Sequence, residues 1–236
     1  MNKSNMQMKQ CFSLLTAVLV TSVALPVVAG EVSGKVKLDG TAPAPKMIPL
    51  DTDPTCKVLS LKPAPTRHYV VGADNGLANT FVYIKETPGG KKYDPPADMP
   101  VLDQKGCMYE PYAMGVMVDQ KFKIRNSDPV MHNVNAGTFN FAQTAQGQET
   151  IKSFSKPEVA VKFMCNVHPW MFGFMGVFEH PFFAVTDKDG NYKLPAGLPA
   201  GEYTLVAWHP KAGESTQKIT VGADDKKTAD FSLKVK

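Results

Sequence analysis

The sequence predicts an all-β protein made of a larger β-sandwich and a second, smaller one. Three observations indicate this class. Short runs of alternating apolar and polar residues recur along the chain, turn-forming Gly, Pro, Asn and Asp residues separate these runs, and no long helical period follows the first residues. With 236 residues, the chain is long enough for one or two domains with real cores.

The first 29 residues have the pattern of a secretory signal. Lys3 and Lys9 precede an apolar run from Phe12 to Val28, and compact residues follow where a signal peptidase would cut. We therefore expect cleavage after Ala29 and a periplasmic location, with no stable membrane span afterwards. The alternative is an uncleaved membrane anchor, but the run is shorter than the roughly twenty apolar residues of a membrane span.

We expect four parts along the chain: the signal at 1–29, an N-terminal strand with a proline-rich segment at 30–74, a sandwich at 75–180 and a smaller sandwich at 181–236. Val32, Val36 and Leu38 alternate with polar residues and predict the N-terminal strand. Residues 41–66 are rich in proline, so we expect irregular structure laid over the core.

The larger sandwich is predicted from closely spaced strands. Apolar or alternating runs that each predict a strand lie at 114–118, 121–125, 159–163 and 172–178. Gly173 and Gly176 in the last run indicate a bulge or a close backbone contact. Beyond Pro181, further strand-like runs with turn residues between them predict the smaller sandwich, at 182–186, 192–194, 202–208, 217–221 and 228–235.

The stretch from Phe163 to Met171 holds the densest set of metal-binding side chains. Cys165, His168 and Met171 offer a thiolate, an imidazole and a thioether, which suit copper better than calcium or magnesium. His132, in a separate turn and strand, supplies a second imidazole. Two histidines, one cysteine and a weak axial methionine form an electron-transfer copper site, so the sequence predicts that these four residues bind one copper ion.

This pattern resembles the cupredoxins, the small blue copper proteins, and among them the amicyanin type most. The resemblance rests on His132-Asn133 and on Cys165-Asn166-Val167-His168-Pro169-Trp170-Met171, and it covers residues 75–179. It implies a Greek-key β-sandwich with one type 1 copper ion. The axial ligand would be Met171, or Met175 if the loop departs from the amicyanin pattern. It also implies that Asn133 braces the two ligand loops by hydrogen bonds.

The tail from Phe182 onward resembles the transthyretin-like or carboxypeptidase-regulatory-like sandwich. The resemblance rests on Asp187-Lys188-Asp189-Gly190-Asn191-Tyr192 and on Leu198-Pro199-Ala200-Gly201-Glu202-Tyr203-Thr204-Leu205. Residues 31–40 look like the opening strand of such a unit, so they could pair with the tail.

The predicted function is the transfer of single electrons between periplasmic redox proteins. We expect His168 to lie nearest the surface, ringed by Pro169, Trp170 and Met171, as an apolar patch for a cytochrome, a dehydrogenase or an oxidase. Loss of two lysines with the signal leaves 24 basic residues against 22 acidic ones, without a basic block, which argues against nucleic acid as a partner.

Three alternatives compete with this interpretation. Cysteine and histidine also bind zinc, although a structural zinc site would prefer a fourth charged ligand to a thioether. The methionines near the motif could store or deliver copper, although core filling is their usual role; they are Met131, Met164, Met171 and Met175. Copper enzymes need further metal centres, and only His68, His180 and His209 remain, so we expect no catalysis.

Three of the four cysteines follow the signal, and Cys11 should leave with it. Because Cys165 is assigned to the metal, we expect Cys56 and Cys107 to form a disulfide in an oxidising compartment. The alternative is that both thiols are free and buried.

Overall fold

The structure is a computed structural model that describes residues 30–59 and 64–236; the predicted signal and Cys11 lie outside these residues. Nearly all regular structure in the described part is β-strand, arranged in four sheets. The predicted all-β class with two sandwiches is therefore confirmed. Among the described residues, we find no helix of the length and apolar character needed to cross a membrane.

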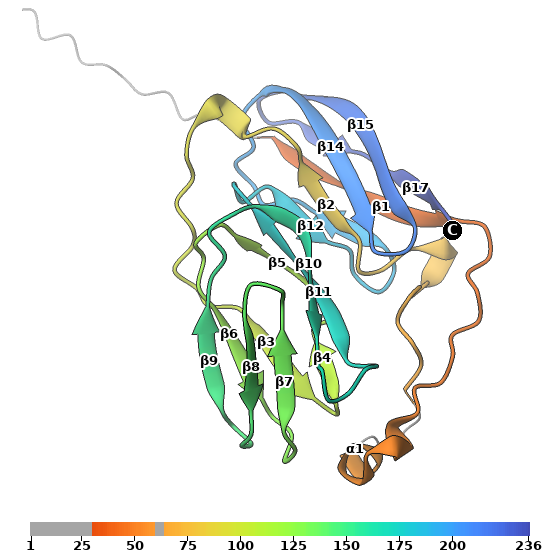
Figure 1. The fold of residues 1–236 in the computed structure, drawn as a ribbon. Coiled ribbons are helices and arrows are strands. Elements are labelled where there is room, and N and C mark those ends of the chain that lie inside the picture. Colours follow the sequence, from red (N-terminus) through yellow and green to blue (C-terminus); the bar gives the residue numbers. More distant parts are fainter. Residues whose placement is uncertain (1–29, 60–63) are drawn as a thin grey trace, which may run out of the picture.

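The first sandwich consists of the sheets β5-β11-β10-β7-β8 and β4-β3-β6-β9 (Figure 1). Its strands are β3 (Val101–Lys105), β4 (Met108–Glu110), β5 (Ala113–Met117), β6 (Phe122–Asn126), β7 (His132–Asn135), β8 (Asn140–Gln143), β9 (Glu149–Lys152), β10 (Glu158–Met164) and β11 (Phe172–Phe178). Leu102, Phe122 and Ile124 of one sheet pack against Val161 and Phe163 of the other. These inward residues alternate with less buried ones along β3, β6 and the end of β10, as expected for a sandwich.

The second sandwich consists of the sheets β13-β1-β16, in which β17 also pairs with β1, and β12-β2-β14-β15. Its strands are β1 (Glu31–Asp39), β2 (Phe81–Ile84), β12 (Phe183–Val185), β13 (Asn191–Lys193), β14 (Gly201–His209), β15 (Gly213–Val221), β16 (Lys226–Thr228) and β17 (Phe231–Lys234). Two 3₁₀ turns, η2 (Ala73–Asn75) and η3 (Pro88–Gly90), flank β2.

Two strands that precede the first sandwich along the chain complete this second sandwich. β1 pairs antiparallel with β13 and parallel with β16 and β17. β2 lies between β12 and β14, whereas the expected boundary at residue 75 assigned it to the copper-binding domain. The alternation that identifies a strand carries no information about its partners, because the same half-buried pattern suits either sandwich.

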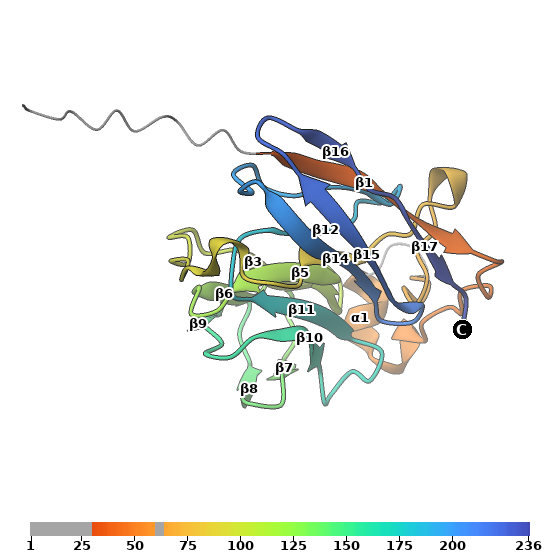
Figure 2. The same cartoon turned by 90° about the horizontal axis from the view of Figure 1, so that it is seen from above.

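A layer of aromatic side chains joins the two sandwiches. Val177 of β11 enters the first core, and its neighbour Phe178 points the other way. The ring centroid of Phe81 lies 6.3 Å from that of Phe178 and 6.1 Å from that of Trp208, so β2 and β14 meet β11 here. Gly176 allows this packing, since a Cβ there would lie 2.5 Å from the Phe178 ring. In Figure 2 the sheet that contains β14 lies between the sheet that contains β1 and the sheet that contains β11.

A short segment outside both sandwiches covers one end of the first sandwich. We call residues 48–59 the cap; it contains η1 (Leu50–Thr52) and α1 (Pro54–Leu59), which is labelled at the lower end of Figure 1. Its side chains Ile48, Leu50 and Cys56 pack with Cys107 and Met108. The predicted irregular segment thus contains a short helix, and a Cys56–Cys107 disulfide fastens it to the turn between β3 and β4.

Candidate metal centre

Neighbouring strands of one sheet bring the predicted ligands together. His132 is the first residue of β7, Cys165 directly follows β10, and His168 lies in the loop between β10 and β11. β10 pairs antiparallel with both β7 and β11. The start of β7, the end of β10 and the start of β11 therefore lie at the same end of the sheet. One imidazole nitrogen of each histidine and Cys165 Sγ all lie within 4.8 Å of one another.

The three donor atoms are His132 Nδ1, His168 Nδ1 and Cys165 Sγ. The two Nδ1 atoms are 3.1 Å apart, and Cys165 Sγ lies 3.6 Å from His168 Nδ1. All three side chains are buried, with exposed fractions of 0% for His132, 1% for His168 and 3% for Cys165. The centre is therefore shielded from solvent.

A carboxylate fixes the orientation of each imidazole ring. His132 Nε2 donates to Asp128 Oδ2 at 2.9 Å, and His168 Nε2 donates to Asp53 Oδ2 at 3.3 Å. An ionised carboxylate can only accept, so each ring carries a proton on Nε2, and Nδ1 is the ring nitrogen left to bind a metal ion. Both Nδ1 atoms therefore face the space beside Cys165.

Local charges favour the ionised form of the cysteine. Burial opposes ionisation of Cys165, but hydrogen bonds from the His132 ring and from backbone N–H groups lower its pKa to about 6. Burial also disfavours a charged His132, yet hydrogen bonds with Asp128 and Cys165 hold the pKa of His132 above its usual value. In the metal-free centre a proton on His132 Nδ1 is therefore shared with the Cys165 thiolate, where a metal ion would otherwise bind.

This donor set fits a metal ion. Two Nδ1 lone pairs and a thiolate so close together repel one another unless a proton or a cation lies among them. Metal–nitrogen bonds of about 2.0–2.1 Å and metal–sulfur bonds of about 2.3 Å place donors roughly 3–4 Å apart. The 3.1 Å and 3.6 Å separations agree with that spacing. Thiolate and imidazole together suit copper or zinc.

Asn133 connects the two ligand segments. Its backbone N–H donates to Cys165 Sγ at 3.3 Å, and its side-chain oxygen accepts from Asn166 N at 3.3 Å. Tyr109 adds a further tie, because its hydroxyl donates to Asn133 O at 2.8 Å. The bracing that the resemblance implied for Asn133 is present as these hydrogen bonds.

Met171, the residue directly before β11, closes the ligand loop. Its backbone oxygen accepts from Cys165 N and its N–H donates to His168 O, both at 2.9 Å. The Met171 side chain is fully buried in the first core, in the same cluster as Cys165 and Met175. Met171 is therefore next to the ligands along a tightly hydrogen-bonded loop.

The expected exposure of His168 is wrong, because the cap covers this residue. The outer edge of its ring faces Asp53 and Cys56, with Cys56 Sγ 3.6 Å from Nε2. Trp170 lies beside the ring at a centroid distance of 5.2 Å and donates to Cys107 O. The apolar patch expected around His168 thus packs against the disulfide-linked cap.

Sequence reasoning missed two residues that shape the centre. Asp128 lies four residues before His132, and this spacing could have identified it as a partner for that ring. Asp53 is separated from His168 by 115 positions, and nothing in the sequence links them. The disulfide expected between Cys56 and Cys107 is present, with Cα atoms 5.6 Å apart.

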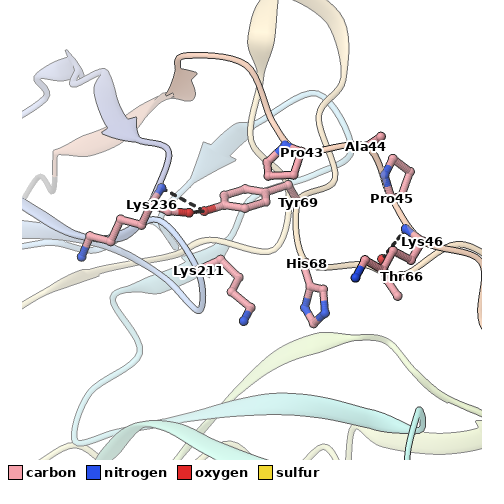
Figure 3. Close-up of a pocket in the computed structure, with 9 residues that line it drawn as sticks. All are labelled: Pro43, Ala44, Pro45, Lys46, Thr66, His68, Tyr69, Lys211 and Lys236. Carbon is pink, nitrogen blue, oxygen red and sulfur yellow. Dashed lines mark hydrogen bonds between the residues drawn. The ribbon is translucent and has the colours of Figure 1, made fainter.

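The remaining histidines serve other contacts. His180 Nε2 donates to Ile84 O, and His209 Nδ1 accepts from two backbone N–H groups. A solvent-open hollow of about 300 Å³ lies beside His68 (Figure 3). Its lining residues are Pro43, Ala44, Pro45, Lys46, Thr66, His68, Tyr69, Lys211 and Lys236. None of them belongs to the buried centre formed by His132, Cys165 and His168.

Several solved structures resemble part of this chain. A copper-containing nitrite reductase from Thermus scotoductus is 20% identical over 40% of this chain and 26% of its own, with a TM-score of 0.31. A purple cupredoxin from Nitrosopumilus maritimus is 24% identical over 30% of this chain and 81% of its own (TM-score 0.28). A Cu(I) amicyanin variant is 22% identical over 41% of this chain and 97% of its own (TM-score 0.29).

These matches are partial, and the aligned part spans only about a quarter of the nitrite reductase. No protein-family model matches the chain. No curated protein matches it either. The case for a metal centre therefore depends on the side chains of the chain itself.

Proposed function

We propose that this chain is an exported copper protein that carries single electrons. Copper would be held by His132, Cys165 and His168, with Met171 as a weak axial ligand. The observation that supports this proposal is the convergence of two Nδ1 atoms and a thiolate in one buried space. Copper bound by such a set supplies a one-electron couple between Cu(I) and Cu(II).

The residues around the centre suit this role because they hold the donors still. The Cys165–Met171 backbone hydrogen bond fixes the loop, the Asn133 side chain ties it to β7, and Asp128 orients His132. Burial excludes water from the donors. A small structural change between the two oxidation states favours electron transfer. The partner that we propose is a periplasmic cytochrome, dehydrogenase or oxidase.

The test is an absorption and EPR spectrum of the copper-loaded exported chain. We expect an intense visible sulfur-to-copper charge-transfer band in the wild type, and its loss in Cys165→Ser. His68→Gln removes an imidazole outside the centre and should leave the band unchanged. A Cys165→Ser protein that keeps the band, or a colourless wild type that holds one zinc ion tightly, would contradict the proposal.

Copper storage or delivery is the second candidate. The burial of His168 under the cap favours it, because a carrier normally needs a short path from its metal to the surface. Met131 and Met164, near the centre along the chain, are also partly exposed, at 42% and 37%. Titration with Cu(I) separates the two functions: one tightly bound ion per chain supports the carrier, and several support storage.

A further inference from the structure

Each histidine of the centre has a carboxylate partner at its Nε2 atom, which is the ring nitrogen that faces away from Cys165. Asp128 Oδ2 accepts from His132 Nε2, and Asp53 Oδ2 accepts from His168 Nε2. Each carboxylate also accepts the backbone N–H of one disulfide cysteine, Asp128 from Cys107 at 2.8 Å and Asp53 from Cys56 at 3.0 Å. The disulfide therefore connects the two cysteines whose backbone N–H groups are bonded to these two carboxylates.

The two carboxylates belong to different parts of the protein. Asp128 is buried in the turn before β7 and accepts a further hydrogen bond from Gly106 N at 2.7 Å, so the first sandwich alone holds it. Asp53 belongs to the cap, where Oδ1 accepts from Thr55 N and Cys56 N while Oδ2 faces His168. A covalent bond at Cys56 keeps the cap, and with it Asp53, at the centre.

We propose that Asp53 is a positioning residue for the ligand His168, and that the Cys56–Cys107 disulfide keeps it in place. This inference rests on the proposed copper function. Asp53 holds the His168 proton on Nε2, leaves Nδ1 free for the metal and places a negative charge behind the ring. A carboxylate behind a ligand histidine makes the imidazole a stronger donor. The cap is then part of the metal centre, supplied from outside the sandwich that carries the ligands.

Asp53→Asn tests the charge and leaves most of the cap intact. The amide oxygen of Asn can still accept hydrogen bonds from Thr55 N and Cys56 N. Its NH₂ group then faces His168 Nε2, and this group cannot accept a hydrogen bond from an Nε2–H. Asp51→Asn, an exposed neighbour in the same turn, makes the same change in net charge away from the ring and is the matched control.

The first measurement uses the metal-free protein, so it does not depend on copper. Nitrogen NMR at fixed pH should show the Nε2–H form of His168 in the wild type and in Asp51→Asn. In Asp53→Asn the Nδ1–H form should become the major one, while His132 keeps its wild-type signals. An unchanged His168 in Asp53→Asn would overturn the proposal, as would an equal change in Asp51→Asn.

The second measurement is the reduction potential of the copper-loaded protein. Removal of the negative charge behind His168 destabilises Cu(II) more than Cu(I), so Asp53→Asn should have a higher potential than wild type. It should also bind Cu(II) about 10–100-fold more weakly. Equal potentials in wild type and Asp53→Asn would overturn the proposal and leave the copper function intact, because the wild-type spectrum tests that function separately.

Cys56→Ser tests the tether without altering Asp53. We expect His168 to populate both tautomers once the cap is released, and His132 to stay in its wild-type form because Asp128 is held by the first sandwich. A Cys56→Ser protein with wild-type His168 signals would show that the disulfide is not what keeps Asp53 in place. A change at both histidines would show a general loss of the centre, which also contradicts the proposed selective role.

Discussion

Asp128 Oδ2 lies 2.9 Å from His132 Nε2, and this contact determines which nitrogen of the ring faces Cys165. Both side chains are almost completely buried. Hydrogen bonds from His132 and from the backbone N–H groups of Cys107 and Gly106 outweigh burial and hold the pKa of Asp128 below its usual value. The carboxylate therefore stays an acceptor, and His132 Nδ1 is the ring nitrogen that faces Cys165.

Asp128→Asn should weaken Cu(II) binding by about 10–100-fold, the usual effect of removing the partner of a ligand histidine. The side chain of Asn has one oxygen to accept from the three donors Gly106 N, Cys107 N and His132 Nε2, so the turn before β7 should also be less stable. Competition with a chelator of known affinity measures the first effect. Asp98→Asn, an exposed change of the same charge, is the control; equal affinities of Asp128→Asn and wild type would show that His132 does not need this support.

Met171→Leu should keep copper bound and raise the reduction potential. Leucine has a similar volume, so the buried site should lose less than about 1.5 kcal/mol of stability. The axial ligand tunes the redox potential of such a site. Cu(I) tolerates a lower coordination number than Cu(II), so loss of the axial sulfur favours the reduced form. Met175→Leu is the matched control in the same core. If Met175→Leu shifts the potential and Met171→Leu does not, Met175 is the axial ligand.

The convergence of His132, Cys165 and His168 could be predicted because their placement is mostly local. Cys165 and His168 are three residues apart on one loop, and a strand ends at Met164. His132 could be recognised from its residue type and its position after a turn. Alternation likewise predicted the strand that became β1, but it could not show that β1 pairs with β16 and β17 as well as with β13.

The environment of His168 could not be predicted because it depends on a distant segment. Asp53 meets it only after the cap folds back over the end of the first sandwich. The proline-rich composition of residues 41–66 indicated irregular structure over the core but not which part of the core it covers. A single disulfide pairing fixes that position, and the pairing alone does not show that the ligand loop lies beneath it.

Removal of the disulfide should destabilise the protein and loosen the cap. The two cysteines are separated by 51 residues, for which the chain-entropy model gives about 4 kcal/mol of stabilisation. In Cys56→Ala/Cys107→Ala we expect a lower urea midpoint and faster amide hydrogen exchange in residues 48–59. Amides of β14, in the second sandwich, serve as the internal reference. Wild-type exchange rates in the cap would show that packing alone holds it.

Protonation of His209 should make the protein less stable in mild acid. His209 ends β14 with 1% of its surface exposed, and burial lowers its pKa to about 4. In the unfolded chain a histidine titrates near 6.5. The unfolded state therefore binds the proton first as pH falls, so the free energy of unfolding should be highest above about pH 6.5 and decrease down to about pH 4.

The difference between wild type and His209→Gln isolates this contribution, because the carboxylates titrate in both proteins. Glutamine stays neutral, and its oxygen can accept from Lys211 N and Ala212 N as His209 Nδ1 does. From pH 7 to pH 4, the wild type should lose on the order of 3 kcal/mol more than the variant. Urea unfolding at each pH measures both curves, and parallel curves would show that His209 is protonated equally well in the folded and unfolded states.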